Sequence, residues 1–511
     1  MTTHAPDRPI VCIGFMGAGK TTAARSAAEA LGGEAVDVDL VIEERLGKSI
    51  EQIFAEDGEE AFRAFEEHVT LELLRAPSTS VLALGGGAVI HERVREALAS
   101  HLVIWLDVPL ETAWARVEGT GRPLARDRAG FAALYAEREP LYAALADVTV
   151  TGERSHELPA ILEALSGLPA DVKMLWAANA SGDYPAYIGP GLLAERYWPA
   201  TVDGRRFLVT DGNVGRRYGE AFEELSGRVA IMPGEQSKTV AHADIVWSEL
   251  ARAGMTREDV LVALGGGVVG DLTGFCAATY QRGVRYVQVP TSLVAQVDSA
   301  YGGKTGVDLA EAKNYVGAYH QPSAVIADTD ALRTLPAAEL AAGYAEVLKT
   351  ALIAGGPLWE RIRAGADPSS PEIVTACARA KLRIVAQDER DAGLRQVLNL
   401  GHTVGHAIEA VTGYASYRHG EAVGLGLLVA LRLSEQPELR EEVAALLTSH
   451  DLPTTLDGAD PDAVVMATAR DKKRLGERPV PFVLLDAPGL PRPGSAVETR
   501  ALIAAVRELA G

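Results

Sequence analysis

A glycine-rich turn between a short apolar run and an alanine-rich segment limits most strongly how this chain can fold. The apolar run Ile10–Gly14 leads into Gly14–Thr21, whose sequence is Gly-Phe-Met-Gly-Ala-Gly-Lys-Thr, and Ala18–Leu31 then has a helical composition. A strand, a loop of the form Gly-x-x-x-x-Gly-Lys-Ser/Thr and a helix, in this order, predict a phosphate-binding loop. Glycines let the backbone fold around phosphate groups, and N–H groups at the helix N-terminus then face the anion.

The side chains of this loop indicate what it binds. Lys20 can reach the outer phosphates of a nucleotide, and the Thr21 hydroxyl is placed to bind Mg²⁺. We therefore predict that ATP with Mg²⁺ is bound by Gly17, Ala18, Gly19, Lys20, Thr21 and Thr22.

Length and periodicity predict several domains of the α/β class. A chain of 511 residues is too long for one hydrophobic core, and about three domains are expected. Apolar runs alternate with helical patterns in two regions, which predicts two mostly parallel sheets. The expected strands, besides the first, are Ser80–Leu84, Leu102–Leu106, Val148–Val150, Phe207–Thr210, Val229–Met232, Val260–Leu264 and Tyr286–Val289.

The strand signals fade from about residue 335, and helical patterns replace them. The expected helices are Ala337–Ala354, Pro371–Gln387, Gly401–Thr412, Gly420–Leu433 and Arg440–Ser449. Glycine and proline in Ser166–Pro169, after a helical pattern at Leu158–Leu165, predict a domain boundary near residue 170. We expect a P-loop domain with a parallel sheet at residues 1–170, a Rossmann-like α/β domain at 171–334 and a mostly α-helical domain at 335–511.

Charge and cysteine content exclude some classes of protein. The net charge of −20 and the lack of a basic run argue against nucleic-acid binding. No apolar run reaches the roughly 18 residues that span a membrane, and the N-terminus lacks the apolar part of a signal peptide. Cys12, Cys276 and Cys377 fit no metal-ligand spacing, which is typical of structural thiols in a reducing compartment. We expect a soluble, cytoplasmic protein.

A second group of chemically informative residues lies far downstream. His402, His406 and His419 fall close together, although the chain has only 11 histidines. Histidine is the commonest transition-metal ligand and the usual acid–base group near neutral pH. His402 and His406 share a helix face, so spacing alone would pair them on a metal. Upstream, Gly265–Asp271 follows the apolar run Val260–Leu264, but it is not a strict Gly-x-Gly-x-x-Gly and is a weak dinucleotide signal.

Segments around the first glycine loop resemble a known family. They are Asp37–Asp39, Gly58–Glu66, Gly85–Gly87, Gly121–Leu124 and Arg138–Tyr142. Their order and spacing resemble shikimate kinase over essentially all of residues 8–165. The resemblance implies that Asp37 holds Mg²⁺ with Thr21, and that Asp39 orients the acceptor and acts with Lys20 in catalysis. The other implied contacts are Arg63, Arg138 and the Gly86 backbone for shikimate, Arg122 on a mobile lid for the phosphates, and Arg116 for adenine.

Segments after the second glycine turn resemble another family. They are Ala277–Val284, Val289–Ser292, Gln296–Ser299, Gly302–Gly306, Lys313–Asn314 and His320–Pro322. Their order resembles 3-dehydroquinate synthase over about residues 185–480, a family that uses NAD and a divalent metal, usually zinc or cobalt. The resemblance takes Glu346, His402 and His419 as metal ligands and places His406 at the substrate phosphate. Two histidines and a carboxylate with open positions are typical of a catalytic metal site.

The same resemblance implies the remaining contacts. The NAD site would consist of Asp211, Asn213, Glu235, Lys238, Gly267, Val268, Val269, Gly270, Asp271, Thr291, Ser292, Lys304 and Lys313. The substrate carboxylate and hydroxyls would be bound by Lys349, Lys381, Arg395 and Asn399. The substrate phosphate would be bound by Arg282, Lys304, Asn314, His406 and either Lys472 or Lys473. In this family the residue equivalent to Arg282 comes from a second subunit, which implies a homodimer.

The two resemblances together imply a bifunctional enzyme of aromatic biosynthesis. The first part would transfer a phosphoryl group from ATP to shikimate. The second would convert 3-deoxy-D-arabino-heptulosonate 7-phosphate to 3-dehydroquinate and phosphate, with transient oxidation of a substrate hydroxyl by NAD⁺. Two positions depart from the family pattern: Ala312 stands where glycine is usual before Lys313, and Asp391 stands where glutamate is common, which leaves its role open.

Other interpretations fit part of the sequence. A kinase for another small acid, such as gluconate, could be fused to a different sugar-phosphate cyclase or to a polyol dehydrogenase. A dehydrogenase would not need Lys381, Arg395, Asn399 and Asn314 together, and the chain has all four, which favours the synthase. A regulatory pseudoenzyme would typically have lost its catalytic groups. The chain retains Lys20, Asp37, Asp39, Glu346, His402 and His419, so we expect two active sites.

Overall fold

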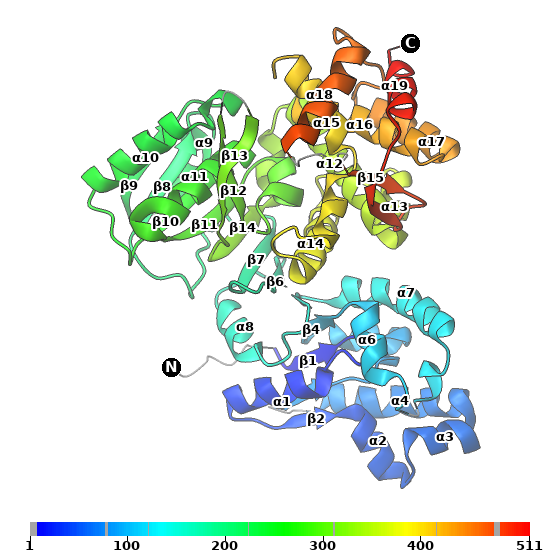
Figure 1. Ribbon diagram of the computed structural model, residues 1–511. Helices are drawn as coiled ribbons and strands as arrows, with labels where there is room; N and C mark the ends of the chain where they lie inside the picture. The colour runs from blue at the N-terminus through cyan, green and yellow to red at the C-terminus, as the bar shows by residue number, and fades with distance from the viewer. Residues whose placement is uncertain are drawn as a thin grey trace. The chain divides into compact units, whose positions relative to one another are not determined.

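The protein folds into two compact units. The computed structural model describes residues 8–76, 80–120, 122–222, 224–309, 312–414, 416–474 and 481–510, except for the side chains of residues 312 and 469–474. The first unit contains Met1–Tyr187 and Tyr197–Asp203, and the second contains Ile188–Arg196 and Gly204–Gly511 (Figure 1). The domain boundary near residue 170 stays a prediction, and the strands that follow it directly belong to the first unit.

The first unit is built on a parallel sheet. Its strands lie in the order β2-β3-β1-β4-β5-β6, and neighbouring strands in this order run parallel to each other. The predicted strands of this region are therefore present, and β1 and β4 are buried along their whole length because each has neighbours on both sides. The strand bounds are β1 (Ile10–Ile13), β2 (Ala35–Asp37), β3 (Val81–Ala83), β4 (Leu102–Asp107), β5 (Val148–Thr151), β6 (Lys173–Ala177) and β7 (Tyr184–Gly189).

Helices connect these strands, as the alternating pattern predicts. The predicted helix at 18–31 begins two residues later, because Gly19 has a positive φ of 89° and caps the helix. The helices of the first unit are α1 (Lys20–Leu31), α2 (Val38–Leu46), α3 (Ile50–Glu56), α4 (Gly58–Arg75), α5 (Glu92–Leu98), α6 (Leu110–Val117), α7 (Arg128–Leu145) and α8 (Leu158–Ala164).

The second unit begins with another parallel sheet, in the order β14-β11-β10-β8-β9. Apolar side chains of its central strands, such as Phe207 and Leu261, pack against Val246, Leu272 and other residues of the covering helices. An antiparallel hairpin of β12 and β13 follows β11 and carries a bulge. The elements are β8 (Arg206–Asp211), α9 (Val214–Tyr218), β9 (Leu225–Ile231), α10 (Val240–Arg252), β10 (Val260–Gly265), α11 (Gly267–Thr279), β11 (Arg285–Pro290), β12 (Lys304–Leu309), β13 (Ala312–Tyr319) and β14 (Ala324–Asp328).

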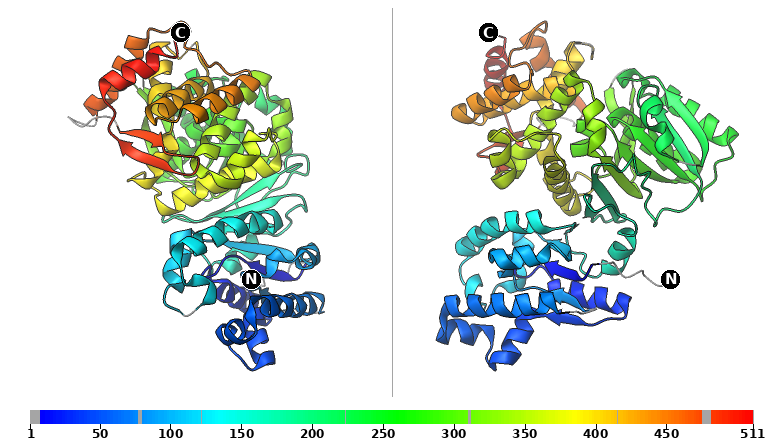
Figure 2. Two further views of the ribbon diagram at one scale, coloured as in Figure 1. Left: turned by 90° about the vertical axis from the view of Figure 1, so that its right-hand side faces the viewer. Right: turned by 180° about the vertical axis from the view of Figure 1, so that it is seen from behind.

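The rest of the second unit is mostly helical, as predicted (Figure 2). The exception is a short antiparallel hairpin of β15 and β16 near the end of the chain. The elements are α12 (Ala337–Ala354), α13 (Gly356–Arg363), α14 (Pro371–Gln387), α15 (His402–Val411), α16 (His419–Leu433), α17 (Pro437–Ser449), α18 (Pro461–Arg474), β15 (Phe482–Leu485), β16 (Pro491–Ser495) and α19 (Thr499–Arg507).

Glycines in α16 let this helix approach its neighbours very closely. A Cβ atom at Gly420 would lie 1.8 Å from the Ala342 carbonyl oxygen of α12. A Cβ atom at Gly426 would lie 1.9 Å from the Gly401 carbonyl oxygen, just before α15. Any side chain at these positions would push the helices apart. This matters for function because α12, α15 and α16 carry the predicted metal ligands.

The three cysteines are buried in the structure. Cys12, Cys276 and Cys377 are all free and buried, and burial raises the pKa of each thiol, to about 12 for Cys12. They are thus structural thiols, as predicted.

Within the described residues, none of the helices combines the length and hydrophobicity that crossing a membrane requires.

Replacing Gly426 with alanine should lower the free energy of unfolding by about 1–3 kcal/mol, because the added methyl group meets backbone. Urea unfolding followed by circular dichroism measures this loss. Gly424→Ala, in the same helix, is the matched control, since its Cβ would meet only the Leu447 side chain, at 3.1 Å. Equal losses in the two variants would contradict the close-packing argument.

Candidate active sites

The loop before α1 has the geometry of a phosphate site. Gly14, Gly17 and Gly19 have positive φ angles of 145°, 78° and 89°. A Cβ atom at Gly14 or Gly17 would lie 2.8 Å from a carbonyl oxygen, that of Leu106 or Ala113 respectively. Glycine is therefore required at both positions, and the backbone N–H groups at the start of α1 can face an anion.

The end of β2 brings carboxylates to this loop. Asp37 accepts hydrogen bonds from the Thr21 hydroxyl (2.5 Å) and from the Asp39 N–H (3.0 Å). A hydroxyl and a carboxylate in contact beside the loop fit the oxygen ligands that Mg²⁺ prefers. Desolvation raises the pKa of Asp39 to about 6, although Lys20 opposes this shift, and desolvation lowers the pKa of Lys20.

Two arginines reach the same region from α4 and α7. Arg63 forms an ion pair with Glu66, with 2.6 Å between Nη1 and Oε2. Arg138 is buried, and its Nε has no hydrogen-bond partner within the described residues. A buried guanidinium N–H that lacks a partner is well suited to an anionic ligand. One helical turn later, Tyr142 donates to the Gly86 carbonyl oxygen (2.5 Å), which fixes the backbone beside the arginines.

The triple glycine after β3 is needed to make room for these polar groups. A Cβ atom at Gly85 would lie 2.4 Å from an oxygen of Glu66 and 2.7 Å from an oxygen of Asp39. At Gly87 it would lie 1.9 Å from Nη1 of Arg63. Side chains here would therefore displace the acid and base groups that face the loop.

The two arginines predicted near the nucleotide differ in how they are held. Arg116 on α6 donates to the Gly17 carbonyl oxygen (2.8 Å) and pairs with Glu153 (2.5 Å). Arg122 is exposed before a short 3₁₀ turn, and its charge contributes to lowering the pKa of Lys20. Gly121, which precedes it, lies outside the described residues.

The second candidate site is a cavity of about 1570 Å³ in the second unit. It brings together residues that are distant in the sequence. The predicted residues that line it are Asp211, Asn213, Glu235, Lys238, Gly267, Val268, Val269, Asp271, Thr291, Ser292, Lys304, Lys313, Asn314, Glu346, Lys349, Lys381, Arg395, Asn399, His402, His406 and His419.

Among the predicted synthase residues whose side chains the structure describes, Gly270 and Arg282 do not line this cavity. Gly270 is buried inside α11, where a Cβ atom would lie 2.7 Å from an oxygen of Gln288, so it serves packing. Arg282 is exposed after α11, at a turn where Gln281 and Arg282 both have positive φ angles, of 47° and 70°. The chain on its own therefore does not place Arg282 at the substrate site.

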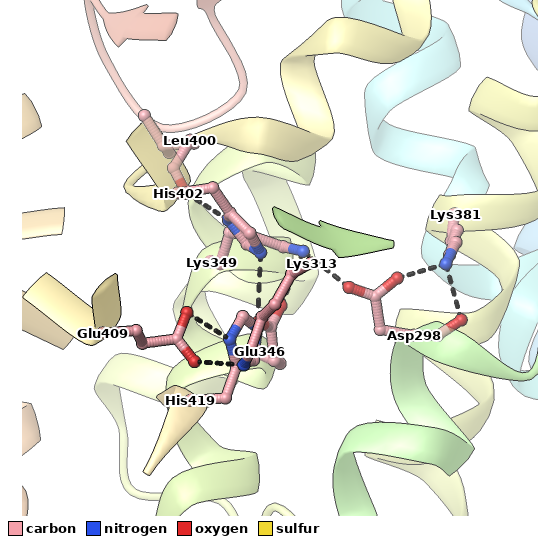
Figure 3. Close-up of polar contacts among 9 residues, drawn as sticks. All are labelled: Asp298, Lys313, Glu346, Lys349, Lys381, Leu400, His402, Glu409 and His419. Atoms are coloured by element: carbon pink, nitrogen blue, oxygen red, sulfur yellow. Dashed lines mark hydrogen bonds and ion pairs between the residues drawn. The ribbon is translucent and has the colours of Figure 1, made fainter. Parts of the chain in front are cut away.

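Glu346, His402 and His419 line this cavity and form a compact cluster (Figure 3). One ligand atom from each lies within 4.8 Å of the others. His419 Nε2 lies 3.2 Å and His402 Nε2 3.5 Å from Glu346 Oε1, and His402 Nδ1 lies 3.2 Å from the Leu400 carbonyl oxygen. Within the described residues, the buried Glu346 oxygens take part in ion pairs but accept no well-oriented hydrogen bond. This set of donors fits a catalytic divalent metal.

Burial and neighbouring charges together set the protonation states of the groups in this cluster. Burial disfavours the ionised form of Glu346, but Lys349 and the histidines outweigh it and hold the pKa well below its usual range. Burial lowers the pKa of His402 to about 3, which leaves its imidazole neutral and able to bind a metal. Burial acts in the same direction on His419, but Glu346 and Glu409 outweigh it and raise this pKa to about 10.

Asp298 joins two buried lysines next to the cluster (Figure 3). Its carboxylate lies 2.7 Å from Lys349 Nζ and contacts Lys381 Nζ, which also donates to the Asp298 carbonyl oxygen (2.6 Å). Lys349 lies 2.6 Å from Glu346 as well. Burial lowers the pKa of Lys381 to about 8. The lysines are therefore fixed by charge pairs before any substrate binds.

Comparisons with known proteins show which families the chain is related to. Family models described as 3-dehydroquinate synthase N-terminal and C-terminal match residues 228–342 and 343–474, and a shikimate kinase model matches residues 16–167. The 3-dehydroquinate synthase of Symbiobacterium thermophilum is 45% identical over 317 residues, which cover 57% of this chain and 88% of that protein. The chain belongs to the 3-dehydroquinate synthase family. Residues 16–167 form a shikimate kinase domain that is fused to the synthase, so the chain combines two enzymes of the shikimate pathway.

Solved structures support the fold of the synthase part. A 2-epi-5-epi-valiolone synthase from Streptomyces hygroscopicus subsp. jinggangensis is 26% identical, with a TM-score of 0.59 and coverage of 64% of this chain and 96% of that one. A 2-deoxy-scyllo-inosose synthase is 25% identical, with a TM-score of 0.58 and coverage of 66% and 99%. These other cyclases are less similar in sequence than the 3-dehydroquinate synthase, which favours the synthase over the alternative cyclase.

Some charged residues in or beside the synthase cavity have no role that the sequence predicts. Asp298 lies in a segment that carries the family resemblance, but only the structure shows its contacts with lysines. Glu409 follows His402 by seven residues, so the helical period places both on one face, and this signal could have identified it. Asp391, whose role was open, contacts Lys304. The side chains of Lys472 and Lys473 lie outside the described part of the chain.

Asp298→Asn should destabilise the synthase part by about 3–5 kcal/mol, because Lys349 and Lys381 lose their shared counter-ion while they stay buried. The free energy of unfolding in urea measures the loss. The control is Asp330→Asn, since that carboxylate forms an exposed ion pair with Arg333 and should contribute no more than about 0.5 kcal/mol. A loss no greater than that of the control would show that Asp298 does not stabilise the lysines.

Proposed function

We propose that each unit carries out one reaction with the residues assembled in its own site. The first unit phosphorylates the 3-hydroxyl of shikimate with ATP and Mg²⁺. The second converts 3-deoxy-D-arabino-heptulosonate 7-phosphate to 3-dehydroquinate and phosphate, with NAD and Zn²⁺ or Co²⁺. The observation that carries the proposal is the cavity of the second unit, where the Glu346, His402 and His419 cluster, a glycine-led helix and several lysines face one space.

In the kinase site, the chain supplies positioning and charge. Asp37 and Thr21 hold Mg²⁺, and Lys20 neutralises charge on the phosphates. Asp39 orients the acceptor hydroxyl, and its raised pKa brings it closer to the range in which a carboxylate can accept a proton. The shikimate carboxylate is bound by Arg63 and Arg138, beside the Gly86 backbone. The exposed Arg122 approaches the phosphates from the lid, and Arg116 lies at the adenine end.

In the synthase cavity, the N-terminus of α11 is the proposed site of the NAD pyrophosphate. Gly266 caps this helix and Gly267 is its first residue, so free N–H groups point to the cavity. One solved cyclase contains NAD⁺ with Co²⁺ and another contains NAD⁺ with Zn²⁺. When bound, NAD⁺ supplies the hydride acceptor and the metal polarises the substrate oxygen. The other NAD contacts are those named from the sequence.

Cationic groups that line the same cavity are suited to an acidic sugar phosphate. Arg395 is buried and donates to the Gly302 carbonyl oxygen (3.0 Å), while its Nε has no hydrogen-bond partner within the described residues. This N–H, with Lys381 and Asn399, is the proposed site of the substrate carboxylate. Lys304 and Asn314 on the β12–β13 hairpin, together with His406, are placed to bind the phosphate.

The proposal extends to the assembly and location of the protein. Residues 171–334 and 335–511 are taken as the NAD-binding and metal-binding domains of the synthase. The exposed and strained turn at Arg282 suits a residue that enters the site of a second subunit, so we propose a homodimer that acts in the cytoplasm on small molecules.

Single substitutions should separate the two activities. His419→Ala should abolish conversion of the heptulosonate phosphate, because it removes a metal ligand, and leave shikimate phosphorylation unchanged. Asp39→Asn should abolish shikimate phosphorylation and leave conversion of the heptulosonate phosphate unchanged. Paired assays of the purified chain measure both, with the synthase also tested after chelation and after Co²⁺ is restored. Turnover of NAD⁺ with glycerol, and none with the heptulosonate phosphate, would instead support a polyol dehydrogenase.

Mixing two inactive variants tests the shared site. Arg282→Ala and His419→Ala should each lack synthase activity, but a mixed dimer contains one site with both residues intact. Random exchange of subunits should therefore restore about a quarter of wild-type activity. The control is a mixture of Lys349→Ala and His419→Ala. Both residues line the cavity of their own chain, so every site in a mixed dimer lacks one of them, and the mixture should have no synthase activity. Failure of the first mixture in an exchanging dimer would place Arg282 outside the partner's site.

A further inference from the structure

Glu409 is a buried carboxylate to which the reaction described above gives no role. It lies on α15, on the same helix face as His402, and its exposed fraction is 2%. Its two oxygens point to different partners (Figure 3). Oε2 lies 3.4 Å from His419 Nδ1, and Oε1 lies 2.9 Å from Lys313 Nζ. A buried carboxylate between a metal ligand and a lysine of the cofactor site is costly unless both contacts are used.

The two nitrogens of the His419 imidazole face two different carboxylates. Its Nε2 faces Glu346 at 3.2 Å, and its Nδ1 faces Glu409 at 3.4 Å. A histidine that binds a metal through one nitrogen is usually held by a hydrogen bond at the other, which fixes the tautomer and the ring orientation. His402 is held in the same way: its Nε2 faces Glu346, and its Nδ1 lies 3.2 Å from the Leu400 carbonyl oxygen. Glu409 thus occupies the position of an orienting carboxylate.

Lys313 reaches Glu409 from β13. It also lies 3.5 Å from Glu235 and 4.6 Å from the centre of the Tyr414 ring. Burial disfavours the charged form of Lys313, but Glu235 and Glu409 outweigh this and raise its pKa. Glu409 therefore helps to keep a cation at the end of the β12–β13 hairpin, next to residues assigned to NAD.

A second metal site is the competing explanation for this carboxylate. His406, Glu409 and His419 also place one ligand atom each within 4.8 Å of one another. The ammonium group of Lys313, however, already lies 2.9 Å from Glu409, and a second cation would meet its charge. In addition, His419 could serve that ion only through Nδ1, which would remove the contact that orients its ring. The geometry favours one metal, supported by Glu409.

We propose that Glu409 is a positioning residue that orients His419 for the metal and holds Lys313 in place for NAD. The inference rests on the proposed function, in which the metal and NAD share this cavity. Through Glu409, the metal ligand of α16 and the cofactor residue of β13 depend on the same carboxylate.

The first test measures metal binding by the purified, metal-free full-length chain, by titration with Co²⁺ against a competing chelator. With the metal site of the first unit saturated by excess Mg²⁺, Glu409→Gln should bind Co²⁺ about 10–100-fold more weakly than wild type, with one Co²⁺ per chain in both. Glu409→Asp keeps the charge and should recover part of the affinity. Glu421→Gln is the matched control: this carboxylate lies two residues from His419, but it contacts Arg418 and should leave Co²⁺ affinity unchanged.

The second test is a double-mutant cycle on NAD⁺ affinity, measured by equilibrium dialysis in metal-free protein. Glu409→Gln should weaken NAD⁺ binding when Lys313 is present and should have no effect in the Lys313→Met background. An equal effect in both backgrounds would overturn the part of the proposal that concerns Lys313. Thermal unfolding of the metal-free chain separates positioning from a merely structural role, which would lower the midpoint of Glu409→Gln but not its Co²⁺ affinity.

Two further outcomes are distinguishable. Wild-type Co²⁺ affinity in Glu409→Gln, or two ions per wild-type chain and one in the variant, would overturn the role of Glu409 and leave the metal assignment intact. Wild-type Co²⁺ affinity in His419→Ala would instead overturn the proposed metal site itself.

Discussion

Pairing of buried charge in one cavity is the constraint on which the synthase part depends. Glu346 and Glu409 are buried and Asp298 is half-buried, in or beside the same space, and each would be costly to desolvate without a partner. Lysines and histidines neutralise them, so the ionised carboxylates can stay out of water. An apolar cavity of this size would be easier to build, but it could not bind a metal or an acidic sugar phosphate. The charge pairs that stabilise the cavity are thus made by the same groups that bind the substrate and cofactors, so these pairs must rearrange on binding.

The backbone that holds these pairs depends on close helix packing. Glu346, His402 and His419 come from α12, α15 and α16, and the last two residues are the first of their helices. Contacts of Gly420 and Gly426 with backbone atoms set the spacing of these helices, so glycines that carry no reactive group themselves fix the distances within the cluster. Such rigidity suits a catalytic metal site, because a ligand held in position loses little freedom when the ion binds.

The sequence predicted the local features of this protein better than its long-range contacts. The glycine loop, the strand alternation and the helical last third all depend on periodicity and turn chemistry, and all are present in the structure. Spacing also correctly placed His402 and His406 on one helix face, where their ring centres lie 5.3 Å apart. It could not show that His419, from another helix, joins His402 at Glu346, because that contact depends on how helices pack. The family resemblance supplied this information. The partners of Asp298 and Glu409 are set by packing alone, so only the structure revealed them.

The two active sites are each built within one compact unit. The groups around the glycine loop come from β2, α1, α4 and α7 of the first unit, and the residues that line the synthase cavity all belong to the second. The two reactions are not consecutive, since 3-dehydroquinate must be converted further before shikimate exists to be phosphorylated. Direct passage of an intermediate would therefore gain nothing from the fusion. Covalent linkage instead fixes the ratio of the two enzymes at one to one.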